Sequence, residues 1–158
     1  MYLIFKMEKI LIFDIDDTLI MHTRQKNDYY NLNNNDIINN LLNNINYDKI
    51  YIYTNGTYGH GKKVIDNLNV KVDGIFGRDT IPYMKPHPGS FNFVNNIVNN
   101  NSDECIFFDD LLDNLNTAKS IGWKTVWITP NFNVSKPQNV DYIFPNIYHA
   151  LLYFCLKE

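Results

Sequence analysis

The sequence predicts an α/β fold, a three-layer α/β/α domain with a central parallel sheet of about five strands. Short apolar runs alternate with segments of helical periodicity along the 158 residues, which is typical of successive βαβ units. The run Lys9–Phe13 ends in four consecutive apolar residues, as expected for a strand buried on both faces of such a sheet. No repeat or change of composition divides the chain, so we expect one domain over residues 1–158.

The first half of the chain supplies three strands and two helices. The strands are expected at Lys9–Phe13, Lys49–Tyr53 and Gly74–Phe76. Between the first two, apolar residues recur every three or four positions, which predicts an amphipathic helix over residues 33–46 with asparagine on its exposed face. The same spacing predicts a second helix that ends near Asn69.

The second half continues the alternation. The expected elements are a helix over residues 90–99, a strand over 105–108, a helix over 113–121, a strand over 125–128, an edge strand at Tyr142–Phe144 and a closing helix at Ile147–Leu156. The inward face of the first of these helices should consist of Phe91, Val94, Ile97 and Val98. Gly122 follows the second helix, as is common at helix C-termini.

Composition excludes several classes of protein. The apolar fraction of 45% is ordinary for a globular domain, and the net charge of −3 gives no basic field, so we expect no nucleic-acid partner. Cys105 and Cys155 do not form a disulfide framework, which favours a reducing compartment. The sequence shows neither a signal-peptide pattern nor a stretch long enough to cross a bilayer. We therefore expect a cytoplasmic protein without a membrane partner.

The acidic stretch Asp14-Ile15-Asp16-Asp17-Thr18 directly follows the first strand. Carboxylates this close repel one another and would destabilise a purely structural turn, but a cation between them would stabilise it. Ligand sites of open α/β sheets lie at the carboxyl ends of strands. The stretch therefore predicts a metal-assisted site.

Three later segments carry polar residues at corresponding places. They are Tyr53-Thr54-Asn55-Gly56, Met84-Lys85-Pro86-His87-Pro88-Gly89 and Phe107-Phe108-Asp109-Asp110 with Asn114 following. Together with the acidic stretch, and in this order, they resemble the four motifs of the haloacid dehalogenase superfamily of aspartate-nucleophile phosphohydrolases. The resemblance spans about residues 9–128 and implies a Rossmann-like core.

By this resemblance Asp14 is the nucleophile of an aspartyl-phosphate mechanism. Asp16 would protonate the leaving oxygen and later activate the hydrolytic water. The resemblance also implies a Mg²⁺ cofactor bound by the carboxylates of Asp14 and Asp110 and by the backbone carbonyl of Asp16. Asp109 would act on the ion directly or through water.

The resemblance also implies a phosphate-binding set, namely Asp14, Ile15, Asp16, Thr54, Asn55 and Lys85. Thr54 would donate its hydroxyl to the phosphate, with the Asn55 backbone N–H beside it. Lys85 would offset negative charge on the nucleophile and on the phosphoryl group. Asp14, Asp16, Thr54 and Lys85 are thus the expected catalytic residues.

Other readings of single residues remain open. Thr54-Asn55-Gly56 alone is more often a turn than a site, and Lys85 could be a solvated lysine. Asn114 could lie behind the acidic pair or on the surface, and His60 could lie near the substrate or be a surface histidine. Asp113 is expected to cap its helix.

Two further expectations concern aromatic side chains. His87, between two prolines, should have a structural role. Tyr29 and Tyr30 could line the entrance to the site or pack in the core.

The closest resemblance within the superfamily is to the pyrimidine 5′-nucleotidase-like branch, whose members carry a helical cap after the first motif. Here the helix over residues 33–46 is needed as the sheet-covering crossover, which leaves only residues 19–32 for a turn and flap. The gap between Asn55 and Met84 holds one helix and one strand. We therefore predict a capless or minimally capped enzyme with an open site. Either the substrate is large enough to exclude water itself, or the flap or a neighbouring subunit supplies the specificity.

The leading hypothesis, which the resemblance implies, is a Mg²⁺-dependent phosphomonoester hydrolase that acts on a small phosphate ester, such as a nucleotide. One alternative is a capless phosphatase for a phosphoprotein or a nucleic-acid end. Another is a catalytically silent binding module, although both Asp14 and Asp16 are present. Dehalogenase chemistry needs no metal and would leave Asp16 and Asp110 without a role.

Overall fold

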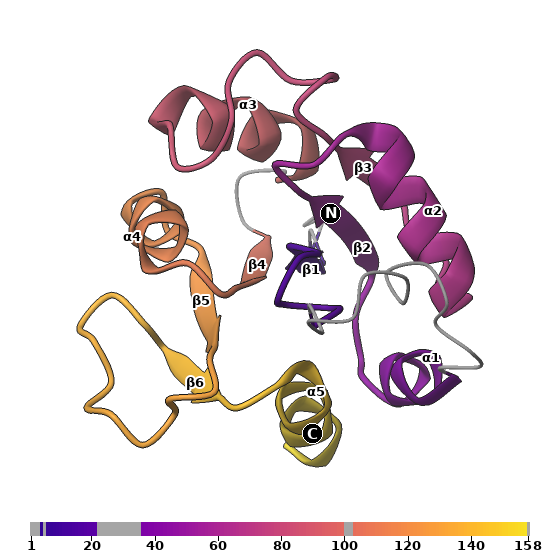
Figure 1. The fold of residues 1–158 in the computed structure, drawn as a ribbon, viewed down its shortest axis with the longest axis vertical. Helices are drawn as coiled ribbons and strands as arrows, with labels where there is room; N and C mark the ends of the chain where they lie inside the picture. The colour runs from indigo at the N-terminus through magenta and orange to yellow at the C-terminus, as the bar shows by residue number, and fades with distance from the viewer. Residues whose placement is uncertain (1–3, 5, 22–35, 100–102, 158) are drawn as a thin grey trace.

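The computed structural model describes residues 4, 6–21, 36–99 and 103–157 and shows one sheet of six parallel strands (Figure 1). The strand order is β3-β2-β1-β4-β5-β6, and every neighbouring pair is parallel. The predicted α/β class and three-layer arrangement are confirmed, and the predicted edge strand is the sixth strand.

The strands and helices alternate almost without exception. In chain order they are β1 Lys9–Phe13, α1 Asp36–Asn43, β2 Lys49–Tyr53, α2 Tyr58–Leu68, β3 Gly74–Phe76, α3 Pro88–Val98, β4 Glu104–Asp109, α4 Leu112–Ser120, β5 Lys124–Ile128, β6 Tyr142–Phe144 and α5 Ile147–Leu156. Because all strands run the same way, their carboxyl ends share one edge of the sheet.

The helices cover both faces of the sheet, with α1, α2 and α5 on one side and α3 and α4 on the other (Figure 1). Consecutive residues of β1 therefore enter different cores: Leu11 and Phe13 face the first group of helices, and Ile10 and Ile12 face the second. This double burial explains the uninterrupted apolar run of the strand.

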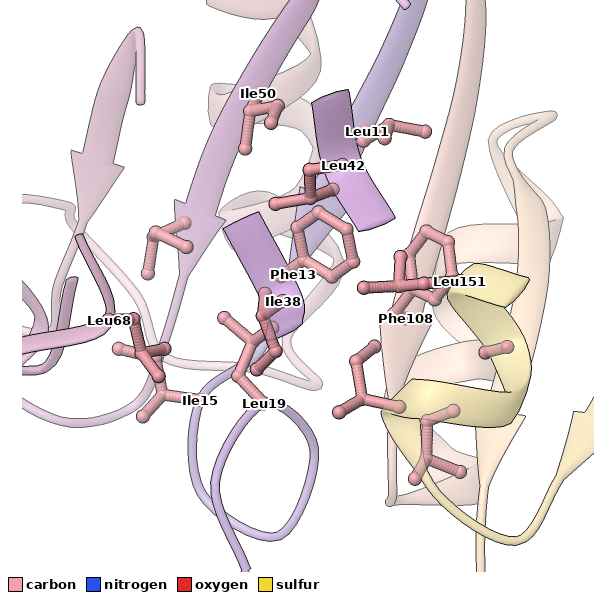
Figure 2. Close-up of a cluster of buried hydrophobic side chains, with 14 of the residues drawn as sticks. Leu11, Phe13, Ile15, Leu19, Ile38, Leu42, Ile50, Leu68, Phe108 and Leu151 are labelled. Carbon is pink, nitrogen blue, oxygen red and sulfur yellow. The ribbon is translucent and has the colours of Figure 1, made fainter. Parts of the chain in front are cut away.

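Figure 2 shows the core on the side of α1 and α5, where side chains from β1, β4 and the loop after β1 meet. The rings of Phe13 and Phe108 stack with centroids 4.4 Å apart. Ile15 and Leu19 reach into the same cluster. The acidic stretch is thus attached to the core by its own apolar residues.

Two expectations about helices were wrong in detail. Phe91 and Val94 are buried in α3 as expected, but Ile97 is 54% exposed. Fewer positions of this helix face the core than its apolar residues predicted. Asp113 does not cap α4. Leu111 occupies the N-cap position and makes no side-chain cap hydrogen bond.

The described residues contain no cap domain, and the small size of the chain agrees with the predicted capless architecture. Of the segment expected to form the turn and flap, only residues 19–21 are described. Residues 22–35, which include Tyr29 and Tyr30 and the start of the helix expected over residues 33–46, lie outside the described residues. Within the described ranges, none of the helices has the length and apolar character needed to cross a bilayer.

Candidate active site

The acidic stretch after β1 forms a tight turn anchored by Ile15. The Ile15 side chain is fully buried. Its carbonyl oxygen accepts backbone hydrogen bonds of 3.1, 2.9 and 3.1 Å from the N–H groups of Thr18, Leu19 and Ile20. Asp17 has a φ of 58°, in the left-handed region that aspartate tolerates better than most residues. The turn therefore fixes the backbone that carries the carboxylates.

Asp14 lies at the carboxyl end of β1 and is 7% exposed. Its Oδ1 accepts a hydrogen bond from Lys85 Nζ at 3.0 Å, and its Oδ2 accepts one from the Thr18 hydroxyl at 3.1 Å. Burial, only partly offset by Lys85, raises the pKa of Asp14 to about 7. Additional positive charge near this carboxyl would therefore favour its ionised form.

Lys85 connects the first and fourth motifs. Its side chain is 1% exposed, and its ammonium group donates to Asp14 and, at 2.7 Å, to Oδ2 of Asp109. Burial alone would lower the pKa of Lys85, but Asp109 and Asp14 raise it above its ordinary value. The reading of Lys85 as a solvated surface lysine is thereby excluded.

Asn55 positions Lys85 through the backbone. The Lys85 N–H donates to Asn55 Oδ1, and Asn55 Nδ2 donates to the Lys85 carbonyl oxygen, both at 2.9 Å. The peptide bond between Lys85 and Pro86 is cis, and the Pro86 carbonyl accepts a hydrogen bond of 3.0 Å from the Thr117 hydroxyl. The loop before α3 is therefore held from both sides.

Asp109 is completely buried and fully engaged with donors. Besides Lys85, its carboxylate accepts bonds from the Leu111 N–H at 2.8 Å and from Asn114 Nδ2 at 3.0 and 3.1 Å. Asn114 is 2% exposed, so it lies behind the acidic pair and is not a surface residue. Together these donors fix the orientation of the Asp109 carboxylate.

Asp110 comes directly after β4 and is only partly buried. Its backbone carbonyl accepts a hydrogen bond of 2.9 Å from the Trp127 indole N–H. Burial, together with the charge of Asp109, raises the pKa of the Asp110 carboxyl to about 6. The Asp110 carboxyl, like that of Asp14, thus lies where Lys85 only partly offsets the effects of burial and of the neighbouring carboxylates.

The site has the ligands that a hard divalent cation prefers. Asp14, Asp109 and Asp110 each offer a carboxylate oxygen, and these atoms lie within 4.8 Å of one another. Mg²⁺ is usually bound through one or two carboxylates together with water. Three carboxylates beside a single ammonium group leave negative charge that a divalent cation would balance. The residues present therefore fit the implied metal.

Thr54 directly follows β2 and has no exposed surface. Its backbone N–H donates to the Phe76 carbonyl oxygen at 2.9 Å, and its hydroxyl oxygen accepts the Gly56 N–H at 3.0 Å. The second motif is thus both a turn, as its composition alone suggests, and a part of the same edge of the sheet as Asp14.

Asp16 has a different environment from the other carboxylates. Its Oδ1 lies 3.1 Å from Nε2 of His60, in the first turn of α2. His60 is therefore not an isolated surface histidine. His87, in contrast, has the structural role expected of it: it caps α3 by accepting the Gly89 N–H and stacks on Tyr83.

Sequence reasoning missed two supporting contacts. The side chain of Asn55 was not assigned a role, although it holds both polar backbone groups of Lys85. Thr18 was not assigned a contact with the nucleophile, yet its hydroxyl donates to Asp14. The sequence signal for this contact is the spacing of Thr18 four residues after Asp14, whereas nothing in the sequence indicates the partner of Asn55.

Comparison with known proteins gives one family. A family model described as haloacid dehalogenase-like hydrolase matches residues 34–122. The matched segment contains Thr54, Lys85, Asp109 and Asp110 and begins after Asp16. None of the curated proteins matches the chain significantly.

Solved structures with a similar fold include two hydrolases of comparable length. The HAD-hydrolase YfnB of Bacillus subtilis, described as bound to magnesium, has 18% identity and a TM-score of 0.65, over 92% of this chain and 99% of that one. The haloacid dehalogenase-like protein SP0104 of Streptococcus pneumoniae has 16% identity and a TM-score of 0.57, over 94% and 98% of the two chains.

The L-2-haloacid dehalogenase of Xanthobacter autotrophicus is also similar. Its complex with covalently bound chloropropionic acid has 15% identity and a TM-score of 0.58 over 75% of this chain. This chain spans 60% of the length of that enzyme. At such identities the likeness concerns the fold alone.

Proposed function

Because this chain belongs to the haloacid dehalogenase-like hydrolases, we propose that it is a Mg²⁺-dependent phosphomonoester hydrolase that works through an aspartyl-phosphate. The observation that carries the proposal is the position of Lys85 Nζ, 3.0 Å from Asp14 and 2.7 Å from Asp109, beside the group formed by Asp14, Asp109 and Asp110. A nucleophilic carboxylate held next to a buried ammonium group and a cation site suits the transfer of an anionic phosphoryl group.

In this proposal Asp14 attacks phosphorus and Asp16 supplies a proton to the leaving oxygen. Asp16 then accepts a proton from the water that hydrolyses the acyl-phosphate, which restores Asp14. The two carboxyls can divide the work because their surroundings differ: the Asp14 side chain is 10% exposed and the Asp16 side chain 34% exposed. A nucleophile is best shielded, whereas a proton carrier must reach solvent.

The remaining residues bind the phosphate and the ion. Lys85 would neutralise charge on the phosphoryl oxygens, and Thr54 and the Asn55 backbone N–H would hold them in place. Asp14 and Asp110, with the backbone carbonyl of Asp16, would hold Mg²⁺, and Asp109 would support the ion directly or through water. When bound, the ion would neutralise phosphoryl charge during transfer.

Dehalogenation is the second candidate, because one similar structure contains chloropropionic acid bound covalently. That reaction also uses a carboxylate nucleophile, but it displaces a halide, which needs no proton. The proposed roles of Asp16 and of the Asp109-Asp110 pair would then have no counterpart. We therefore favour phosphate ester hydrolysis.

The substrate is proposed to be a small phosphate ester, such as a nucleotide. A phosphoprotein or a nucleic-acid end is the alternative, because an open site would admit either. A catalytically silent binding module is the least favoured reading, since a silent module has no need of the buried ion pair between Lys85 and Asp14.

The test is hydrolysis of p-nitrophenyl phosphate by the native protein with Mg²⁺ or with EDTA, beside hydrolysis of 2-chloropropionate. We expect phosphate release with Mg²⁺, its loss in EDTA, and a decrease of at least about 1,000-fold in Asp14→Asn, because the nucleophile is removed. Asp113→Asn, on the exposed side of α4, is the matched control and should retain activity. Chloride release, or phosphate release unaffected by Asp14→Asn, would contradict the proposal.

A further inference from the structure

The Asp16 carboxylate has a partner that the mechanism above does not use. Asp16 Oδ1 lies 3.1 Å from His60 Nε2, and the two side chains are 34% and 14% exposed. They come from separate elements, the turn after β1 and the first turn of α2. The contact therefore links the first motif to the helix that follows the second.

His60 is held firmly in place. Its backbone N–H donates to the Thr57 hydroxyl at 3.1 Å, which is the N-cap interaction of α2. Its ring lies against Gly56, where an added Cβ would stand 2.7 Å from His60 Cδ2. A glycine at position 56 thus makes room for the imidazole.

Asp16, in contrast, has a fixed backbone but stands outside the group of carboxylates. The turn anchored by Ile15 holds its main chain, whereas the oxygens that approach within 4.8 Å of one another, among the described residues, belong to Asp14, Asp109 and Asp110. Because Asp16 is only two residues from Asp14, a cation bound by that group would attract its carboxylate unless another group held it. The Nε2 of His60 is in position to do so.

We propose that His60 is a positioning residue that holds the Asp16 carboxylate at the mouth of the site, where it can reach the leaving group. This inference rests on the phosphatase function proposed above. His60 does not itself touch the reacting atoms. It acts by keeping Asp16 away from the metal and aimed at the departing oxygen.

The proton balance is compatible with a contact that lasts through the cycle. In the first step an oxygen of Asp14 bonds to phosphorus, the bond from phosphorus to the leaving oxygen breaks, and the proton of Asp16 passes to that oxygen. In the second step water attacks phosphorus, one proton of the water passes to Asp16, the bond between Asp14 and phosphorus breaks to restore the Asp14 carboxylate, and phosphate leaves. If the proton resides on Oδ2, the His60 N–H can donate to Oδ1 in both states.

The experiment compares two substrates that differ in their need for a proton. The leaving group of an alkyl phosphate such as glycerol 2-phosphate is a strongly basic alkoxide that needs a proton. The leaving group of p-nitrophenyl phosphate is p-nitrophenolate, which departs with little assistance. We expect His60→Ala to lower kcat/KM for the alkyl ester by about 10- to 100-fold, and for the aryl ester by less than about 3-fold. The ratio kcat/KM reports the transfer of the phosphoryl group to Asp14, which is the step in which the leaving oxygen is protonated.

Two variants serve as controls. His60→Gln places an amide N–H near the position of Nε2 and should restore most of the activity on the alkyl ester. His149→Ala changes the histidine at the same position in α5, three residues after its N-cap Asn146, and should leave both activities unchanged. If His60→Ala does not fold, His60→Asn replaces it, because its shorter amide cannot reach Asp16.

The outcomes separate the two proposals. An equal decrease on both esters, or no decrease, overturns the role of His60 while the phosphatase function stands. A native protein that hydrolyses neither ester overturns both. A selective loss on the alkyl ester that His60→Gln repairs supports the inference.

Discussion

At the scale of single residues, the Lys85 ammonium group determines the charge balance of the interior. It lies between the carboxylates of Asp14 and Asp109, with side-chain exposures of 1%, 10% and 0% respectively. Each ion loses solvation on burial, and only their mutual attraction and hydrogen bonds offset that cost. Removal of the cation would leave two buried negative charges facing each other.

We therefore expect Lys85→Met to destabilise the protein by about 3–5 kcal/mol in EDTA, as is usual when one partner of a buried ion pair is removed. Urea unfolding measures the free energy of unfolding. Lys62→Met is the matched control, because Lys62 pairs with Asp66 on the exposed side of α2 and such pairs contribute about 0.3–0.5 kcal/mol. A loss for Lys85→Met no larger than for Lys62→Met would contradict this account.

The sequence predicted the residue types of the site better than their supports. The position of Asp14 after an apolar strand was visible, because strand ends and ligand sites coincide in parallel sheets. The support of Lys85 by Asn55 joins residues 30 apart in the chain, and no local pattern reports a contact that depends on tertiary packing. Asn114 remained undecided for the same reason: only the fold shows that its side of α4 faces Asp109.

At the scale of elements, the connections between elements depend more on the ends of the helices than on their interiors. The chain after α4 turns through Gly122, with φ of 88°, and continues directly into β5. The Gly122 N–H donates to the Lys119 carbonyl oxygen at 3.1 Å. Asp113 could not be recognised as lying inside the helix, because an acidic residue is equally common at the N-cap and in the first turn.

Gly122→Ala is expected to lower the free energy of unfolding by about 1–2 kcal/mol, because a left-handed backbone is unfavourable for a residue with a Cβ. An added Cβ would meet no atom within 4 Å, so the cost is conformational and not steric. Gly59→Ala, in the first turn of α2 and equally open, should instead stabilise by up to about 1 kcal/mol. Thermal unfolding of both variants measures the contrast, and a change of the same sign in both would refute it.

Asp141 joins α4 to β5 and makes stability depend on pH. Its carboxylate accepts bonds from Lys119 Nζ at 2.7 and 2.9 Å and from the Thr125 N–H at 2.9 Å. Burial raises the pKa of Asp141, but these interactions outweigh it and hold the pKa below its ordinary value of 3.8. The stability that Asp141 contributes is therefore complete above pH 3.8 and is lost as the pH falls through the lower folded value.

Asp141→Asn should accordingly lower the free energy of unfolding by about 1 kcal/mol near neutral pH. The difference from the native protein should be constant down to about pH 5 and should shrink at lower pH, where the native carboxylate becomes protonated. Urea unfolding between pH 3 and pH 8 measures this. A difference that grows as the solution is acidified would show that the pKa is raised on folding.

At the scale of the whole molecule, the order of the strands assembles the site. Placing β1 beside β4 brings Asp14 next to Asp109, and β2 on the other side of β1 adds Thr54. The alternation of strands and helices predicted the parallel sheet and its layers, because the periodicity of each element can be read from the local sequence. The order of the strands within the sheet cannot be read in this way, since it depends on contacts between distant segments.

Addition of Mg²⁺ should stabilise the native protein. An ion that binds only the folded state adds about 2.7 kcal/mol at one hundred times its dissociation constant, which corresponds to an increase in Tm of about 5–10 °C for a chain of this size. Asp110→Asn should remove most of the increase. Differential scanning fluorimetry with MgCl₂ and with an equal ionic strength of NaCl tests this, and an equal shift with both salts would mean that no specific site exists.

The pairing of β1 with β4 also has a consequence for the order in which the chain folds. Ile10 lies opposite Cys105 and Phe13 opposite Phe108, so the central ladder joins segments about 95 residues apart. Contacts of such sequence separation form late, because the entropy of closing the intervening chain must be met before they can contribute. On a ribosome the first strand must wait until residue 109 has emerged. Folding intermediates would therefore lack the candidate cation site, and a metal ion could bind only to the completed molecule.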